Sequence, residues 1–340
     1  MISIRPLLIS LAFCASALTT HAAHAAEADP SIDDTTLTAE EQAEADQWKR
    51  FVADSVKSSD LRLRILLSQG DLVLSGKNYV WVGGIPVESL VEQARGSTDP
   101  LVLASLIARC EMGAPKQPRC KVLDLARRWT MADTQNQLAW LTLASELKQH
   151  GDLEGARATF IRASEASIWH DNYGDGSRVL AHALPRAMPP LMRLYSLHRA
   201  TNVSAIFTLG SSALSNLSRF CKDAALRKAC LRIVDTMSRD ADNLMSLRVA
   251  AGLTEYNGAP EMIARARRQR ADAIYWGAMM SYPRDISKSD PTAVAAALNH
   301  AEQLIELGEI AVAQRNLTKS GISEAEAAAR FAAAYPRSPK

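Results

Sequence analysis

The sequence has few aromatic residues and almost no net charge. Phe, Trp and Tyr make up 6% of the 340 residues, and 39 Lys and Arg stand against 37 Asp and Glu, which leaves a net charge of +2. A nearly neutral chain has no overall field that attracts a polyanion, so we expect no nucleic-acid partner. The low aromatic content also argues against a cleft lined for sugar rings.

The sequence also lacks the short motifs that mark common active sites. It contains neither HExxH nor GxSxG, its His residues are scattered, and no pair of carboxylates stands at a spacing that defines a site. We therefore expect no catalytic residue, no metal and no cofactor. An enzyme is less expected than a binding protein, although one built from scattered residues would leave no sequence motif.

Long apolar runs are absent except near the N-terminus. The stretch Leu7–Leu18 follows Arg5 and precedes small residues that end at Ala25, the pattern of a secretory signal peptide. Such a stretch is too short to span a membrane. We expect cleavage near Ala25 and a periplasmic or secreted protein without a membrane span. Acylation of Cys14 is the alternative, but Phe13 stands where lipoprotein signals place a small residue.

Cysteines are scarce, and those beyond the leader form two close pairs. The pairs, separated by 10 and 9 positions, are Cys110 with Cys120 and Cys221 with Cys230. In an exported chain this spacing predicts two local disulfides, each joining the end of one helix to the start of the next. A metal site is the alternative, but neither pair has zinc-knuckle spacing and no His lies within a pair.

The segment 137–167 contains the clearest structural pattern. Bulky and small residues recur at the spacing of two short helices joined at a Gly: Trp140, Leu143, Ala144, Gly151, Ala156, Phe160 and Ala163. This pattern resembles the tetratricopeptide repeat. The resemblance implies an all-α fold in which antiparallel helix pairs stack as an α/α superhelix, with these residues as packing positions. Proteins of this kind bind other proteins and rarely catalyse.

Helical patterns extend over most of the chain. We expect a flexible leader at 26–37, a helical-repeat domain at 38–335 and a polar tail at 336–340. Within the domain, 99–167 and 203–274 share the order helix, Cys loop, helix and helix hairpin, which suggests a duplication. A helix is predicted from Asp60 toward Leu74, whereas residues 78–85 favour extended structure.

Two aromatic segments are candidate partner contacts. Trp169, His170 and Tyr173 lie in the densest polar and aromatic cluster, and Trp81 stands beside two glycines. An exposed aromatic side chain can anchor a partner. The alternatives are a helix connector for the first segment and packing over the first helices for Trp81. A calcium loop starting at Asp171 is a poor match, since His182 replaces the bidentate Glu.

A further basic segment on a predicted helix contains Arg265, Arg267, Arg268 and Arg270, which we interpret as a solvated face. Taken together, the patterns predict a periplasmic scaffold or adaptor that binds a protein or peptide on a concave helical surface and has no catalytic activity. The alternatives are a secreted α/α-toroid-type enzyme acting on cell-wall or polysaccharide substrates, and an assembly module of an envelope complex. The patterns specify neither the partner nor the oligomeric state.

Overall fold

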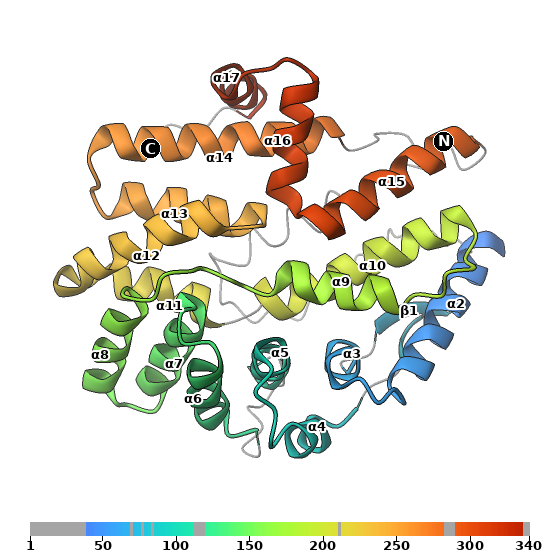
Figure 1. Cartoon of the computed structure of the whole chain (residues 1–340), viewed down its shortest axis with the longest axis horizontal. Helices are drawn as coiled ribbons and strands as arrows, with labels where there is room; N and C mark the ends of the chain where they lie inside the picture. The colour runs from blue at the N-terminus through green and yellow to red at the C-terminus, as the bar shows by residue number, and fades with distance from the viewer. Residues whose placement is uncertain are drawn as a thin grey trace.

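A computed structural model describes residues 39–68, 71–75, 78–82, 85–111, 120–209, 212–281 and 290–335 (Figure 1). The predicted signal peptide, leader and tail lie outside these ranges. The elements are α2 (Ala39–Ser55), α3 (Leu61–Leu66), β1 (Asp71–Ser75), β2 (Asn78–Val82), α4 (Val87–Gln93), α5 (Pro100–Glu111), α6 (Val122–Ala132), α7 (Gln137–Gln149), α8 (Leu153–Ala163), α9 (Tyr173–Ala183), α10 (Pro190–Leu209), α11 (Ser212–Cys221), the short 3-10 helix η2 (Ala224–Leu226), α12 (Arg227–Asp240), α13 (Leu244–Tyr256), α14 (Glu261–Ser281), α15 (Pro291–Leu307), α16 (Glu309–Lys319) and α17 (Glu324–Ala334).

The all-α class is confirmed, with one small hairpin as the exception. β1 and β2 pair in antiparallel register, with Leu72 opposite Trp81. The extended structure predicted for 78–85 is present in β2, but the helix predicted toward Leu74 is wrong beyond Leu66. Apolar residues recur at Leu72–Leu74, so the prediction extended the helix across Gly70. Pairing with β2 instead satisfies the backbone hydrogen bonds of β1.

Helix starts follow the local capping chemistry. The carboxylate of Asp99 accepts a hydrogen bond from the backbone N–H of Leu101 at 3.0 Å, and that of Asp290 accepts one from Thr292 at 2.9 Å. In both cases a Pro occupies the first helical position, where its missing N–H is not needed. The Asp-Pro pairs in the sequence therefore mark the starts of α5 and α15.

Neighbouring helices pack in chain order over two parts of the molecule. α5 packs on α6, α6 on α7 and α7 on α8; later, α12 packs on α13 and α13 on α14. Between these runs the order breaks, because α10 crosses the middle of the molecule (Figure 1) and contacts α2, α3, α5, α9 and α15. The predicted stacking of antiparallel helix pairs as an α/α superhelix is therefore not confirmed by these contacts and stays a prediction.

The two runs are joined side by side rather than end to end. α7 also packs against α11, and α8 against α12. The largest apolar core accordingly extends from α3 through α8 and on to α11, α12 and α13, while a second core lies among α2, α3, α9, α10 and α15. The first Cys-containing region thus shares one core with the second. The order helix, Cys loop, helix and helix hairpin recurs in both regions, and their duplication stays a prediction.

Both predicted disulfides are present. Cys110 and Cys120 are bonded with their Cα atoms 6.0 Å apart, and Cys221 and Cys230 with theirs 5.4 Å apart. Each bond joins the end of one helix to the beginning of the following helical segment. All four residues are buried, so the bonds lie within the apolar core rather than on its surface.

Candidate binding groove

The predicted repeat unit forms the hairpin of α7 and α8. Ala144, Ala156, Phe160 and Ala163 are fully buried, and Leu143 is nearly so. Gly151, in the turn, has φ +84°, a left-handed conformation that side chains with a Cβ rarely adopt.

Trp140 is partly buried and is held at the edge of the hairpin. Its indole N–H donates to the carbonyl oxygen of Thr134 at 2.8 Å, and the Arg162 guanidinium of α8 lies 5.6 Å from its ring centroid. With the buried residues of the hairpin, it acts as a packing position, as the repeat resemblance implies.

The outer face of α7 is not open to a partner. α6, α8 and α11 surround this helix, and residues on several of its sides are buried, including Thr142 at 1% exposure and Ser145 at 0%. The hydroxyls of both residues donate to carbonyl oxygens of α7 itself. The expected concave surface of first helices is therefore covered at this unit by α11 of the same chain.

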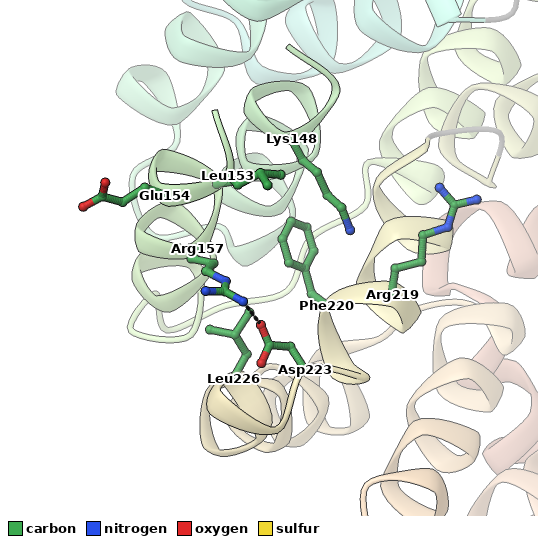
Figure 2. A pocket seen from close by; sticks show the side chains of 9 residues that line it. Lys148, Leu153, Glu154, Arg157, Arg219, Phe220, Asp223 and Leu226 are labelled. Carbon is green, nitrogen blue, oxygen red and sulfur yellow. Dashed lines mark hydrogen bonds and ion pairs between the residues drawn. The ribbon is translucent and has the colours of Figure 1, made fainter. Parts of the chain in front are cut away.

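A groove lies instead where this hairpin meets α11 and η2 (Figure 2). Its volume is about 530 Å³, within the range of roughly 300–1,000 Å³ typical of ligand sites. The lining residues come from α7, α8, α11 and the loop after it: Lys148, Leu153, Glu154, Ala156, Arg157, Arg219, Phe220, Asp223 and Leu226. The repeat unit and the second Cys loop thus form opposite walls of one groove.

The floor of the groove is apolar and held by aromatic stacking. The rings of Phe160 and Phe220 stack with their centroids 4.7 Å apart and their planes 25° apart. Phe220 is only 4% exposed, so its position is set by packing on both sides. On the rim, Leu153 is 61% exposed and is thus an apolar side chain available to a ligand.

The rim of the groove is basic. The Lys148 ammonium lies 4.8 Å from the centroid of the Phe220 ring, a cation–π arrangement. Arg157 forms an ion pair with Asp223 at 2.8 Å, which joins α8 to the Cys loop. Figure 2 shows Glu154 directed away from the other side chains. Lys148 and Arg219 therefore contribute positive charge that no nearby carboxylate of the groove neutralises.

The disulfide between Cys221 and Cys230 braces one wall. It closes the loop that contains Asp223 and Leu226, and Phe220 immediately precedes it. A short closed loop samples few conformations, so these groove residues are held in place before any ligand arrives.

The predicted aromatic contacts are not on the surface. Trp169 is 3% exposed and Tyr173 6% exposed, so the expectation that they present an aromatic face to a partner is wrong. Both fill the core because the segment after α8 turns inward between α7 and α12–α13; the backbone N–H of Gln137 donates to the carbonyl of Ile168, for example. The side chain of Trp81 lies outside the described part of the structure.

His170, the third predicted contact residue, is half-buried and paired. Its Nε2 lies 3.1 Å from Asp175 Oδ2, and Arg178 contacts the other oxygen of the same carboxylate. Hydrogen bonds from His170 and Arg178 lower the pKa of Asp175 to about 2, while the bond to Asp175 raises the pKa of His170. This triplet stabilises the first turn of α9.

Beneath it, a buried polar cluster joins three segments that are far apart in the sequence. Asp171 accepts hydrogen bonds from Asn243 Nδ2 and, at 2.9 Å, from the Ser246 hydroxyl, both at the start of α13. The Tyr173 hydroxyl donates to Glu309 of α16 at 3.1 Å, and Glu309 also accepts from the backbone N–H of Leu244 at 2.8 Å. These bonds hold α9, α13 and α16 together.

Asp242 completes this cluster, and its pKa is raised. Burial, followed by the charge of Asp171, raises its pKa to about 7, and its carboxyl hydrogen-bonds Asp171. Two neighbouring carboxyl groups ionise together only with difficulty, so Asp242 keeps its proton up to near neutral pH. Local sequence spacing could not indicate this pair, because its members lie on different helix connections.

The cluster has no feature of a calcium loop. The two carboxylates at calcium-type positions, Asp171 and Asp175, are engaged by Asn243, Ser246, His170 and Arg178. Within the described ranges, no group of three or more His, Cys, Asp or Glu side chains has a geometry that could hold a metal ion.

The four arginines of α14 are not simply a solvated face. Arg267 pairs with Asp235 of α12, Arg268 with Glu255 of α13, and Arg270 donates to the carbonyl of Ser238 at 3.1 Å. Arg265 pairs with Glu261 on the same helix. Most of this positive charge therefore joins α14 to α12 and α13, and the interpretation as a solvated face holds only for Arg265.

The fold and the groove define a mainly helical protein with a surface groove braced by a disulfide. No helix in the described ranges is long and apolar enough to cross a membrane. Comparison with protein-family models, curated proteins and solved structures finds no match for the chain. The argument for function therefore rests on the groove itself.

Proposed function

We propose that this protein is an exported helical scaffold that binds a protein or peptide partner, and that the groove between the α7–α8 hairpin and α11 is the contact site. The export signal and the tetratricopeptide-like unit of the sequence support this function. The observation that carries it is the combination of an apolar floor, an exposed Leu153 and a basic rim on a wall closed by a disulfide.

Each feature of the groove suits binding rather than catalysis. Covering a partly exposed apolar side chain with a partner makes a favourable contribution to the free energy of binding. A wall that is already rigid loses little conformational entropy on binding. The charged side chains around the floor select partners by charge. The groove contains two acidic side chains, but Asp223 is paired with Arg157 and Glu154 points away from the floor (Figure 2).

No observation favours the alternative of an enzyme acting on polysaccharides. The carboxyl pair Asp171 and Asp242 lies in the hydrogen-bonded cluster that holds helices together, and the groove described above does not open onto it. General acid–base catalysis needs acids that reach a substrate.

The test compares two exposed apolar side chains. Leu153 lies on the groove rim at 61% exposure, and Met262 lies on α14 at 80% exposure, outside the groove. The mature protein carrying Leu153→Glu should lose specific partners in co-purification from a periplasmic extract, while Met262→Glu should retain them. Retention of every partner by Leu153→Glu, or the absence of any specific partner with the unaltered protein, would contradict the proposal.

A further inference from the structure

Two cations at the groove have no ionic partner among the described residues. The Lys148 ammonium contacts the face of Phe220, and Arg219 donates to the amide oxygen of Asn216 at 3.3 Å. Both contacts are with uncharged groups. Arg157, in contrast, is paired with Asp223. Lys148 at the end of α7 and Arg219 at the end of α11 therefore remain available to negative charge on a ligand.

These cations stand around an apolar surface. Phe220 lies beneath the Lys148 ammonium and directly follows Arg219 in the chain, while Leu153 and Leu226 line the same groove (Figure 2). A complementary ligand carries an apolar side chain with negative charge close to it on the same backbone. A free inorganic anion would leave the apolar part uncovered, and a purely apolar ligand would bury the two cations without partners.

We propose that the groove binds an extended acidic peptide segment, with an apolar side chain against Leu153 and Phe220 and flanking carboxylates paired with Lys148 and Arg219. This inference rests on the proposed function and specifies the chemistry of the partner. The groove volume of about 530 Å³ accommodates a short peptide segment rather than a folded domain. The segment's charge complements the rim, which steers binding and selects against basic partners.

The direct test measures fluorescence anisotropy with two labelled peptides. One is a decapeptide of Asp and Glu with a central Leu, and the other has Lys in place of every acid. The acidic peptide should bind, and its affinity should fall when salt is raised from about 50 mM to about 300 mM, because the pairs are solvent-exposed. The basic peptide should not bind. Equal binding of both peptides, or of neither, would overturn the inference.

Charge reversal identifies the site. The double variant Lys148→Glu/Arg219→Glu should bind the acidic peptide about tenfold or more weakly, since two attractive exposed pairs become repulsive. The matched control is Arg315→Glu/Lys319→Glu on α16, where both residues are exposed and lie outside the groove. Circular dichroism and melting temperature confirm that both variants fold. An equal loss of affinity in the control variant would overturn the inference.

The apolar contact is tested separately with Leu153→Ser. This residue is exposed, so the substitution leaves the core intact, and affinity for the acidic peptide should fall several-fold. Unchanged affinity would show that charge alone attracts the peptide and would overturn the proposed binding mode. Binding of anionic lipid vesicles or single-stranded DNA through Lys148 and Arg219, with no binding of the peptide, would also overturn it.

Failure of this inference is distinguishable from failure of the proposed function. A partner that is lost with Leu153→Glu but retained with Lys148→Glu/Arg219→Glu would support the scaffold function and contradict the inference of an acidic ligand. A protein that loses no partner with either variant would contradict both.

Discussion

At the scale of single residues, a cluster of buried, hydrogen-bonded acidic side chains stabilises the packing of helices. Asp171 and Asp242 come from two connections and Glu309 from the start of α16, and the three meet where α9, α13 and α16 approach one another. A buried polar group is stable only when its hydrogen bonds are made, so this cluster permits one arrangement of the three helices.

The raised pKa of Asp242 predicts a pH-dependent stability. Its pKa is about 7 in the folded protein and about 3.9 in an unfolded chain. Between about pH 4 and pH 7 the folded protein holds a proton that the unfolded chain has released, so this contribution to stability falls as pH rises across that window. Asp242→Asn imitates the protonated acid and should remove this fall.

The measurement is the free energy of unfolding at pH 5 and pH 8. Relative to the unaltered protein, Asp242→Asn should be more stable at pH 8 by an amount on the order of 1 kcal/mol, since a partly exposed group realises only part of its pKa difference. Asp124→Asn, on the exposed face of α6, serves as the control. A variant no more stable than the unaltered protein at pH 8 would contradict the raised pKa of Asp242.

The stacked rings at the groove floor predict a large loss of stability on truncation. Phe160 is fully buried against Phe220, so Phe160→Ala leaves a cavity between α8 and α11 and should lower the free energy of unfolding by about 3–5 kcal/mol. Urea denaturation measures the change. Ile161→Ala at the next position, where the side chain is 42% exposed, should have a much smaller effect. Equal losses in the two variants would contradict the packing described.

At the scale of elements, the helices follow from local patterns and their arrangement does not. The α7–α8 hairpin and the extended segment at β2 are present where the sequence predicts them. β1 was missed because Leu72, Val73 and Leu74 resume the apolar pattern of α3 beyond Gly70, and the prediction did not end the helix at this glycine. The packing of α10 against five other elements was not predictable, since it depends on residues throughout the chain.

A glycine in a turn and a glycine inside a helix predict opposite responses to alanine. Gly151→Ala should destabilise the protein by about 1 kcal/mol or more, because the turn holds φ at +84° although no atom blocks the added Cβ. Gly252→Ala should stabilise it by about 0.5–1 kcal/mol, because this glycine lies inside α13 with open space around it. Melting temperatures test the pair. Changes of the same sign would contradict the conformation of the turn.

At the scale of the whole molecule, two disulfides join helices within a shared core. Their sequence separations are 10 and 9 residues, so the chain-entropy model predicts similar losses of about 2–3 kcal/mol when either is removed. Their locations differ, however. Only the bond between Cys221 and Cys230 closes the loop that forms a wall of the groove.

Removal of each disulfide therefore separates stability from binding. Cys110→Ala/Cys120→Ala and Cys221→Ala/Cys230→Ala should lower the free energy of unfolding by similar amounts, measured by urea denaturation. Only the second variant should also weaken capture of partners at the groove, at a temperature where both variants remain folded. An equal loss of binding in the first variant would show that the disulfide acts through general stability rather than through the wall.

The sequence by itself determined what depends on near neighbours. Helix caps, the packing positions of the α7–α8 hairpin and both Cys pairings involve residues within one or two successive elements, whose spacing is set by helix geometry. The tertiary structure alone decided what depends on distant contacts. Arg157 and Asp223 meet across 66 positions, and Asp171 and Asn243 across 72. Whether Trp169 faced solvent or core, and where a groove opened, followed from such contacts, because burial is a property of the packed chain and not of any short segment.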